Sequence, residues 1–208
     1  MKTLIVGDIH CAWAHLYDLI ESESPDQILQ VGDFGYWPSS PRYWPLPKGL
    51  SVPVYFCDGN HEDHWALRNR EMNLLDKNLT YMPRGSTMEL SDGRKVLFFG
   101  GGASIDRHRR IEGVSWFREE VACEKDLVGI EDVGPVDIVI SHTAPSFIDW
   151  VPDDLNDPTR KALDVVFEEC CPSQWFFGHY HWRNTKSHKG CEFSLLDMAG
   201  HSDWWEEL

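Results

Sequence analysis

The stretch TLIVGDIH, from Thr3 to His10, is a short apolar run that leads directly into Gly-Asp, and the stretch QILQVGD, from Gln27 to Asp33, repeats this pattern. Compact apolar runs of this length are typical of buried strands. Between them, apolar residues recur at helical spacing until Ser24-Pro25, a pair that is typical of a helix end. The sequence therefore predicts a strand, a helix and a second strand parallel to the first.

The rest of the chain continues this alternation of strands and helices. Further strands are predicted at residues 52–56, 96–99, 136–140 and 174–177, the second of them after an Asp92-Gly93 hairpin turn. Helices are predicted at residues 62–71, 119–129 and 159–170. The alternation indicates an α/β fold, and hairpins in the second half indicate that its second sheet is mixed.

Length and composition restrict the class of protein. A chain of 208 residues with 42% hydrophobic residues predicts one packed domain over residues 1–208. Its formal charge of −15 repels nucleic-acid phosphates, so we expect no non-specific nucleic-acid binding. No apolar run approaches the ~18 residues of a membrane span, and neither the first residues nor the six cysteines have the pattern of a secreted protein. We therefore expect a cytoplasmic protein with no membrane partner.

The segment from Tyr36 to Pro53 differs from the rest of the chain, because it holds five prolines and two tryptophans, Trp37 and Trp44. A connection of this length without regular structure favours a lid or a binding rim over a plain linker. Since the segment directly follows Asp33, we expect Trp37 and Trp44 to form an aromatic wall that stacks on a base or an aryl leaving group. Packing within the loop is the competing interpretation.

Side chains that bind metals follow predicted strands at the points where those strands end. Strand ends at one edge of a sheet meet in space, so residues far apart in the chain can share one pocket. In D-x-H and H-x-H, the two outer side chains also point to the same side of an extended backbone. The clusters are Asp8-Ile9-His10, Gly32-Asp33, Asn60-His61, His142 and Gly178-His179-Tyr180-His181.

These donors are carboxylates, imidazoles and one amide, with no thiolate. They suit a hard or borderline divalent ion, with manganese as the first choice and iron, zinc, nickel or cobalt as alternatives. Seven ligands are too many for one ion, whereas two ions about 3.5–4 Å apart need this number if one carboxylate bridges them. Two divalent ions with two aspartates leave a positive local charge, so the sequence predicts an anionic substrate despite the acidic exterior.

In chain order, the motifs D-x-H, G-D, G-N-H-E, H and G-H-x-H extend from Asp8 to His181, and in this order they resemble the calcineurin-like metallophosphoesterases. The resemblance implies a four-layer αββα sandwich of two mixed β-sheets flanked by helices, with a dinuclear metal centre. It implies that Asp8, His10 and His181 hold the first ion, that Asn60, His142 and His179 hold the second, and that Asp33 bridges them.

The resemblance also implies a catalytic role for His61, which would face the phosphoryl group, and Glu62 or another carboxylate would orient it. Paired cations lower the pKa of a bound water, which then attacks phosphorus as hydroxide, with Asp33 holding both ions. An imidazolium near the departing oxygen acts as a general acid. These residues predict a dinuclear-metal-dependent hydrolase of phosphate esters, acting on a small phosphorylated molecule or a nucleotide.

Two departures from the pattern concern the substrate. Serine/threonine protein phosphatases of this superfamily usually read GDxxDRG and RGNHE, but here Tyr36 and Trp37 stand at the Asp-Arg position and Asp58 replaces the second arginine. Both usual phosphate-binding arginines are therefore missing. The densest basic cluster follows Gly100-Gly101-Gly102, and we expect one of its arginines to contact substrate phosphate, since guanidinium groups suit that geometry. Its members are Arg107, Arg109 and Arg110.

Two other functions stay open at this stage. One is a serine/threonine protein phosphatase, which the missing arginines disfavour. The other is a non-catalytic scaffold that reuses the fold, which the complete ligand set disfavours. The sequence does not decide between monoesters and diesters, nor does it give the native metal pair or the oligomeric state.

Overall fold

The structure is a computed structural model, and it describes residues 1–40, 45–152 and 156–208. Within these residues, twelve strands form two six-stranded sheets. Both sheets are mixed, because four central strands are parallel and each edge strand is antiparallel to its neighbour. No helix in this part of the chain is long and apolar enough to span a bilayer.

The first sheet has the strand order β12-β1-β2-β3-β5-β4. Its strands are β1 (Thr3–Val6), β2 (Gln27–Gln30), β3 (Val54–Phe56), β4 (Leu74–Asp76), β5 (Leu79–Tyr81) and β12 (Trp205–Glu207). The second sheet has the order β10-β11-β9-β8-β7-β6. Its strands are β6 (Ser86–Glu89), β7 (Lys95–Phe99), β8 (Ile138–Ser141), β9 (Gln174–Phe177), β10 (Asn184–His188) and β11 (Cys191–Leu195). The six strands predicted from the sequence are present, with ends within two residues of the prediction.

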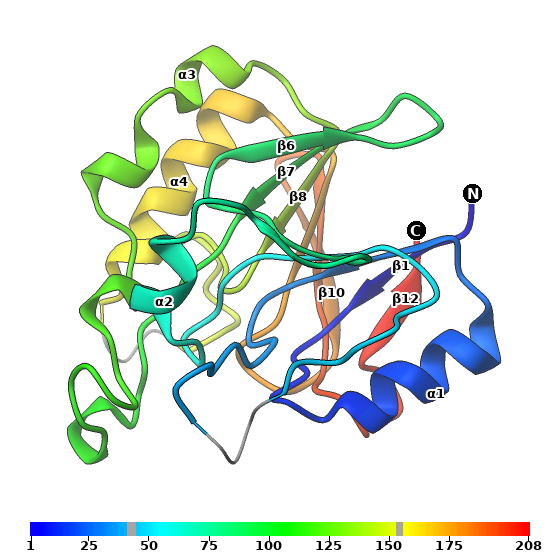
Figure 1. Cartoon of the computed structure of the whole chain (residues 1–208). Coiled ribbons are helices and arrows are strands. Elements are labelled where there is room, and N and C mark those ends of the chain that lie inside the picture. The colour runs from blue at the N-terminus through cyan, green and yellow to red at the C-terminus, as the bar shows by residue number, and fades with distance from the viewer. Residues whose placement is uncertain (41–44, 153–155) are drawn as a thin grey trace.

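Helices cover the outer face of each sheet (Figure 1). Helix α1 (Trp13–Glu23) lies against the first sheet, and α3 (Ile130–Val133) and α4 (Pro158–Cys170) lie against the second. The buried apolar side chains form three clusters, one under α1, one under α3 and α4, and one between the sheets. Successive residues of β1 alternate between two of these clusters, with Leu4 facing α1 and Ile5 facing the other sheet. This arrangement confirms the predicted four-layer sandwich.

The predicted helix at residues 119–129 is wrong. Two short 3-10 helices lie there, η2 (Arg118–Glu120) and η3 (Glu124–Leu127), with extended backbone at Val121 between them. Tertiary partners take backbone groups that a helix would have paired internally: the Thr159 hydroxyl accepts from Ala122 N, and Gly102 N donates to Glu120 O. The predicted helix at 62–71 is shorter than expected, since α2 (His64–Arg68) begins after the N-cap Asp63.

Two glycines allow the loops after the strands to approach each other closely. A Cβ atom on Gly59 would lie 2.1 Å from Asp33 Oδ1, and a Cβ atom on Gly178 would lie 2.0 Å from Asp8 Oδ1. Glycine is therefore required before Asn60 and before His179, because any side chain there would displace a carboxylate. This close packing brings the loops after β1, β2, β3, β8 and β9 to one edge of the sandwich.

Candidate metal centre

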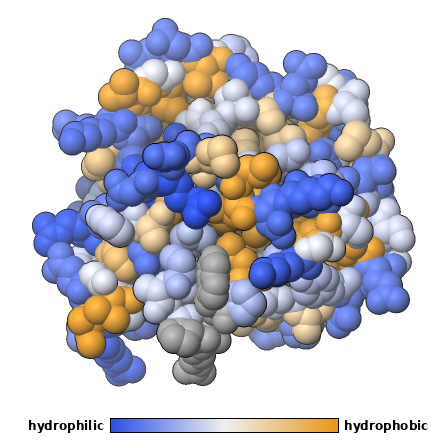
Figure 2. Space-filling view, in the orientation of Figure 1, coloured by the Kyte–Doolittle hydropathy of each residue, from blue (hydrophilic) through white to orange (hydrophobic). Residues whose placement is uncertain are grey.

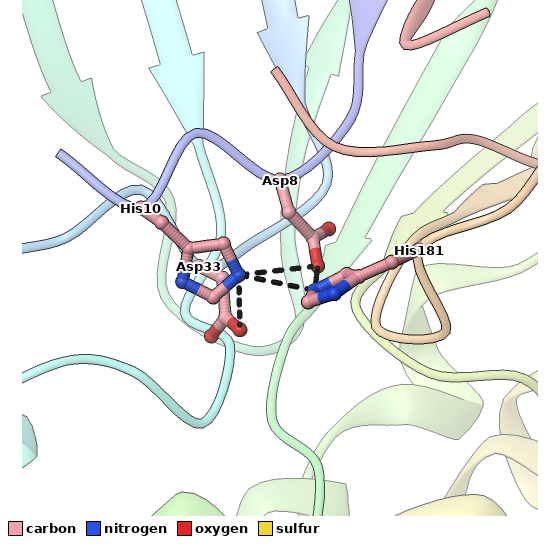
Figure 3. A group of neighbouring side chains, drawn as sticks. All are labelled: Asp8, His10, Asp33 and His181. Carbon is pink, nitrogen blue, oxygen red and sulfur yellow. Dashed lines mark hydrogen bonds and ion pairs between the residues drawn. The ribbon is translucent and has the colours of Figure 1, made fainter. Parts of the chain in front are cut away.

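Four of the predicted ligands form one cluster at this edge (Figure 3). Single donor atoms of Asp8, His10, Asp33 and His181 all lie within 4.8 Å of one another. His181 Nε2 is 3.0 Å from Asp8 Oδ2, and His10 Nε2 is 3.1 Å from His181 Nε2 and 3.5 Å from Asp33 Oδ2. The structure therefore brings together residues from the loops after β1, β2 and β9.

The other predicted ligands converge beside the first cluster. His142 Nε2 is 3.0 Å from Asn60 Oδ1, 3.2 Å from His179 Nδ1 and 3.5 Å from Asp33 Oδ1. Asp33 thus directs one oxygen towards each cluster, Oδ2 towards His10 and Oδ1 towards His142. This is the position that a bridging carboxylate must occupy.

The hydrogen-bond roles around His142 fit a cation. Val31 O can only accept, so Nδ1 of a neutral His142 ring donates to it at 3.1 Å and Nε2 carries no proton. The Asn60 amide donates from Nδ2 to Ser104 Oγ at 3.1 Å, so its Oδ1 is also an acceptor. Two acceptors, His142 Nε2 and Asn60 Oδ1, therefore face each other at 3.0 Å beside the Asp33 carboxylate, and a divalent ion would satisfy them.

The ionisation states agree with this interpretation. Burial lowers the pKa of His179 to about 3, so its ring is neutral, which is the form that binds metals. Burial opposes ionisation of Asp33, but the imidazoles of His142, His61 and His10 outweigh it and lower the pKa of this carboxyl below its ordinary value. The hydrogen bond to Asp8 instead raises the pKa of His181, so a divalent cation bound at this ring would displace a proton.

Several ligands have left-handed backbone, with φ of 48° at His10, 53° at Asp33, 73° at His179 and 57° at His181. Such angles are unfavourable for residues other than glycine and persist only where the surroundings impose them. Here the sharp turns after β1, β2 and β9 direct the side chains back into the same space. Four of the nine described non-glycine residues with positive φ are therefore predicted ligands.

A buried polar chain, which the sequence analysis missed, orients Asn60. Ser104 Oγ accepts from Asn60 Nδ2 and donates to Glu120 Oε2 at 2.6 Å, while Ser104 N donates to Glu120 Oε1 at 2.8 Å. Glu120 is buried, and burial raises the pKa of its carboxyl. No motif marks these residues, because Ser104 lies 44 positions from Asn60 and 16 from Glu120.

His61 lies at the edge of the cluster, with its ring edge-to-face against His10 at 4.7 Å between centroids. Its backbone N donates to Asp33 Oδ1 at 2.6 Å. Burial lowers the pKa of His61, and the Asp33 carboxylate opposes this only in part. Glu62 does not orient the ring, contrary to one expectation, because its carboxylate accepts from Gly35 N and Gly59 N instead.

Arg110 is the arginine of the basic cluster that reaches this site. Its Nη2 donates to His61 Nε2 at 2.6 Å and pairs with Asp106 Oδ1 at 2.7 Å, and its Nη1 donates to Asn60 O at 3.3 Å. Arg107 instead lies 5.0 Å over the Trp116 ring, and Arg109 is exposed in η1 (Arg107–Arg109). The structure therefore places one of the three candidates beside His61.

Of the two tryptophans predicted to form a wall, Trp44 lies outside the described residues. Trp37 is 9% exposed, and its ring centroid is 6.2 Å from that of Phe117. It packs against Phe117, which lies outside the segment from Tyr36 to Pro53, and also lines a cavity that reaches His10 and His61. Stacking of Trp37 on a substrate stays a prediction.

Asp58, which stands where the related phosphatases have arginine, is part of a buried ion pair. Its Oδ2 accepts from Arg84 Nη2 at 2.6 Å and from Nε at 3.0 Å, and both side chains are almost fully buried. Arg84 also donates to Glu119 O and Glu120 O. The pair therefore fixes the segment that carries Glu120, and Asp58 has a structural role here.

The family follows from comparison of the whole sequence. The model of the calcineurin-like phosphoesterases matches residues 1–183, which include every ligand named above. The chain belongs to this family. Membership confirms the resemblance seen in the motifs, and it makes the protein a metal-dependent phosphoesterase. Among curated proteins, no sequence matches the chain significantly.

Solved structures with this fold include proteins of different kinds. A dimetal phosphatase from Danio rerio is 14% identical, with a TM-score of 0.57 over 96% of this chain and 88% of that one. The phosphopantetheinyl hydrolase PptH from Mycobacterium tuberculosis is 13% identical, with a TM-score of 0.54 over 100% and 96%. GAP50, an anchor in the inner membrane complex of Plasmodium, is 10% identical, with a TM-score of 0.55 over 98% and 73%. At these identities the likeness shows the fold alone.

Proposed function

We propose that this member of the family hydrolyses phosphate esters of small molecules or nucleotides at a dinuclear metal centre, in the cytoplasm. The observation that carries the proposal is the convergence of seven metal-binding side chains, with acceptor atoms facing each other around the buried Asp33. A scaffold has no need of a complete ligand set. A protein phosphatase is disfavoured because Asp58 stands where those enzymes have a phosphate-binding arginine. The carboxylate of Asp58 is paired with Arg84 instead.

The two clusters divide the ligands between the ions. Asp8, His10 and His181 would hold the first ion, Asn60, His142 and His179 would hold the second, and Asp33 would be shared. When bound, two divalent ions lower the pKa of a water and neutralise phosphoryl oxygens; manganese suits this donor set best, with iron, zinc, nickel or cobalt as alternatives. The chain itself supplies a carboxylate, Asp33, whose two oxygens face one cluster each, and a neutral imidazole at His179.

His61 and Arg110 act on the substrate. The guanidinium of Arg110 donates to His61 Nε2. When substrate binds, a phosphoryl oxygen, which is a stronger acceptor, replaces the ring as the partner of Arg110. His61 Nε2 is then free to take up a proton from solvent and to donate it to the departing ester oxygen. The backbone bond from His61 N to Asp33 Oδ1 keeps the ring beside the metal centre during this exchange.

A substrate panel tests the proposal. Protein freed of metal and reloaded with manganese, iron, zinc, nickel or cobalt is assayed on p-nitrophenyl phosphate, its bis-ester, 2′,3′-cyclic nucleotides and phosphopeptides. We expect two ions per chain and metal-dependent turnover of the small esters. Two bound ions without turnover would support a scaffold, and turnover of phosphopeptides alone would support a protein phosphatase.

A Ser104→Ala variant should bind the second ion more weakly. Asn60 loses the hydrogen bond that directs its oxygen towards His142, and loss of such a contact typically costs about 10–100-fold in metal affinity. Calorimetric titration of the metal-free protein with manganese measures both sites. Ser173→Ala is the control, because that hydroxyl bonds Asp137 O away from the centre. An equal loss of affinity for both ions would contradict this role for Ser104.

An Arg110→Ala variant should lose about 10–100-fold in kcat/KM, because a hydrogen bond to a charged group contributes about 1.5–3 kcal/mol. Arg107→Ala and Arg109→Ala should keep the parent rate, since neither side chain reaches His61. Steady-state kinetics on one ester compares the three variants. Equal losses in all three would mean that the basic cluster acts only through its overall charge.

A further inference from the structure

Two arginines of the basic cluster, Arg107 and Arg109, do not reach His61, and they lie on a segment that exposes apolar side chains. This segment, residues 105–118, leaves Ile105 73% exposed, Ile111 65% and Val114 61%. It projects at the lower left of Figure 1, and Figure 2 shows hydrophobic side chains there beside hydrophilic ones. Exposed apolar side chains that gather in one place indicate contact with another surface.

The backbone of the 105–118 segment holds two of these side chains in exposed positions. Ile111 O accepts from the backbone N–H groups of Val114, Ser115 and Trp116, at 3.1, 2.9 and 3.1 Å. Ile111 N donates to Ser115 Oγ at 3.0 Å, and Gly113, with φ of 75°, permits the tight turn. Because the turn is already ordered, a surface that covers Ile111 and Val114 would cost little conformational entropy.

The segment is basic, although the chain as a whole is acidic. It holds four arginines and two carboxylates, whereas the whole chain has a formal charge of −15. Both carboxylates are paired with arginines of the same segment, at 2.7 and 2.5 Å: Asp106 with Arg110, and Glu112 with Arg118. Arg107 and Arg109 therefore carry the excess of positive charge. An anionic surface is attracted here, whereas the acidic remainder of the chain is repelled by it.

The segment also borders the opening of the candidate metal centre. Ile105 lines a cavity of about 450 Å³ that reaches Asn60, and Val114 lines a cavity of about 600 Å³ that reaches His10. Trp65 of α2 is exposed and lines a third cavity together with part of the segment. A surface that covers the 105–118 segment would therefore face the opening of the metal centre.

We propose that the 105–118 segment and Trp65 dock the protein on an anionic phospholipid surface, with the opening of the metal centre towards the lipid. Segments that bind such surfaces combine apolar side chains, which enter the headgroup region, with arginines that contact lipid phosphates. The sequence prediction of no membrane partner depended on the absence of a spanning run, and a surface contact requires none.

The apolar residues favour lipid over other anionic partners. A nucleic acid would attract Arg107 and Arg109 but would leave Ile111 and Val114 in water. A protein interface centres on aromatic anchors that fill matching pockets. The apolar side chains of this segment are instead aliphatic and separated by charged residues. A fluid surface accepts such side chains at any spacing, so a phospholipid surface uses both the charges and the apolar groups.

Co-sedimentation with vesicles tests the proposal without any turnover. The protein, metal-free and manganese-loaded, is mixed with vesicles of phosphatidylcholine alone or with vesicles of equal parts of phosphatidylcholine and phosphatidylglycerol. We expect at least about fivefold tighter binding to the anionic vesicles, and weaker binding as the salt concentration rises. No binding to the anionic vesicles, or equal binding to both kinds, would overturn the proposal.

Substitutions in the segment separate the contribution of charge from that of apolar contact. Arg109→Gln should weaken binding to anionic vesicles about fivefold, and Ile111→Ser should weaken it about tenfold. Val114→Trp should strengthen binding, since an indole ring favours the interface. Lys161→Gln and Val165→Ser, both on exposed positions of α4, are matched controls and should bind as the parent does. All five side chains are exposed, so the variants should fold.

A second copy of this chain is the other surface that the experiment can reveal. Sedimentation velocity of the protein without lipid measures self-association. Dimers that Ile111→Ser disperses, with no binding to vesicles, would make the segment an interface between copies and would refute the lipid proposal. Equal losses in the segment variants and in the α4 controls would refute it as well. None of these outcomes affects the proposed function, which turnover of soluble esters tests separately.

Discussion

An Asp33→Asn variant is expected to lose at least about 10³-fold in kcat and to bind fewer than two ions per chain. Asp33 directs Oδ2 towards His10 Nε2 and Oδ1 towards His142 Nε2, so its two oxygens face ligand nitrogens of both clusters. Asparagine keeps the size of the side chain but replaces an anionic oxygen with an amide NH₂, which repels a cation. Loss of several kcal/mol of charge stabilisation at a metal centre corresponds to this fall in rate.

Metal content by mass spectrometry and calorimetry, together with kcat on the preferred ester, measures both effects. Asp92→Asn is a matched control, since it makes the same chemical change on an exposed carboxylate that pairs with Arg94 in a hairpin. The control should bind two ions and retain the parent rate. An Asp33→Asn protein with two ions and full turnover would show that the clusters work independently, and the dinuclear mechanism would be wrong.

The strands that position the ligands were predictable because their signals are local. A compact apolar run followed by Gly-Asp or Gly-His gives both the strand and its end, as in Thr3–Val6 before Asp8 and Gln174–Phe177 before His179. Parallel pairing then places these strand ends at one edge of the sheet. The sequence therefore predicted which residues lie together, although it gave no distances between them. Short edge strands such as β12 lack this signal, since three residues pair with β1 only because the fold brings them there.

The contacts that orient the site were not predictable, because each depends on tertiary packing. Glu120 lies in a segment with a helical pattern, yet Arg84, Gly102 and Thr159 bond this segment's backbone and hold it as separate turns. Ser104 is an unremarkable residue in sequence, and only the fold places it against Asn60. For Arg110, the sequence indicated a basic cluster of three arginines and could not say which one reaches His61.

The fold by itself does not separate an enzyme from an anchor, since structures of both kinds resemble this chain. The difference must lie in side chains that serve chemistry and contribute little to packing. In this protein the ligands have unfavourable backbone angles and facing acceptor atoms, which cost stability in the metal-free chain. Bound ions give a physical reason for this loss of stability, because they would satisfy the facing acceptor atoms.

A His61→Asn variant should lose about 10²–10⁴-fold in kcat on esters of alkyl alcohols while its metal content stays unchanged. The ring is not part of either cluster, and asparagine keeps the backbone N–H that donates to Asp33 Oδ1, so the ligands should stay in place. What is lost is the proton donor for the departing oxygen. His108→Asn, an exposed histidine in η1, is the control and should behave as the parent does.

The leaving group decides whether His61 acts as an acid. An alkoxide must be protonated as it departs, whereas p-nitrophenolate is stable near neutral pH and departs without help. The His61→Asn variant should therefore lose less than about tenfold on p-nitrophenyl esters and far more on alkyl esters with the same second substituent. If both losses are equal, His61 does not donate the proton, and its contribution lies in binding the phosphoryl group, a role that Arg110 beside it would then share.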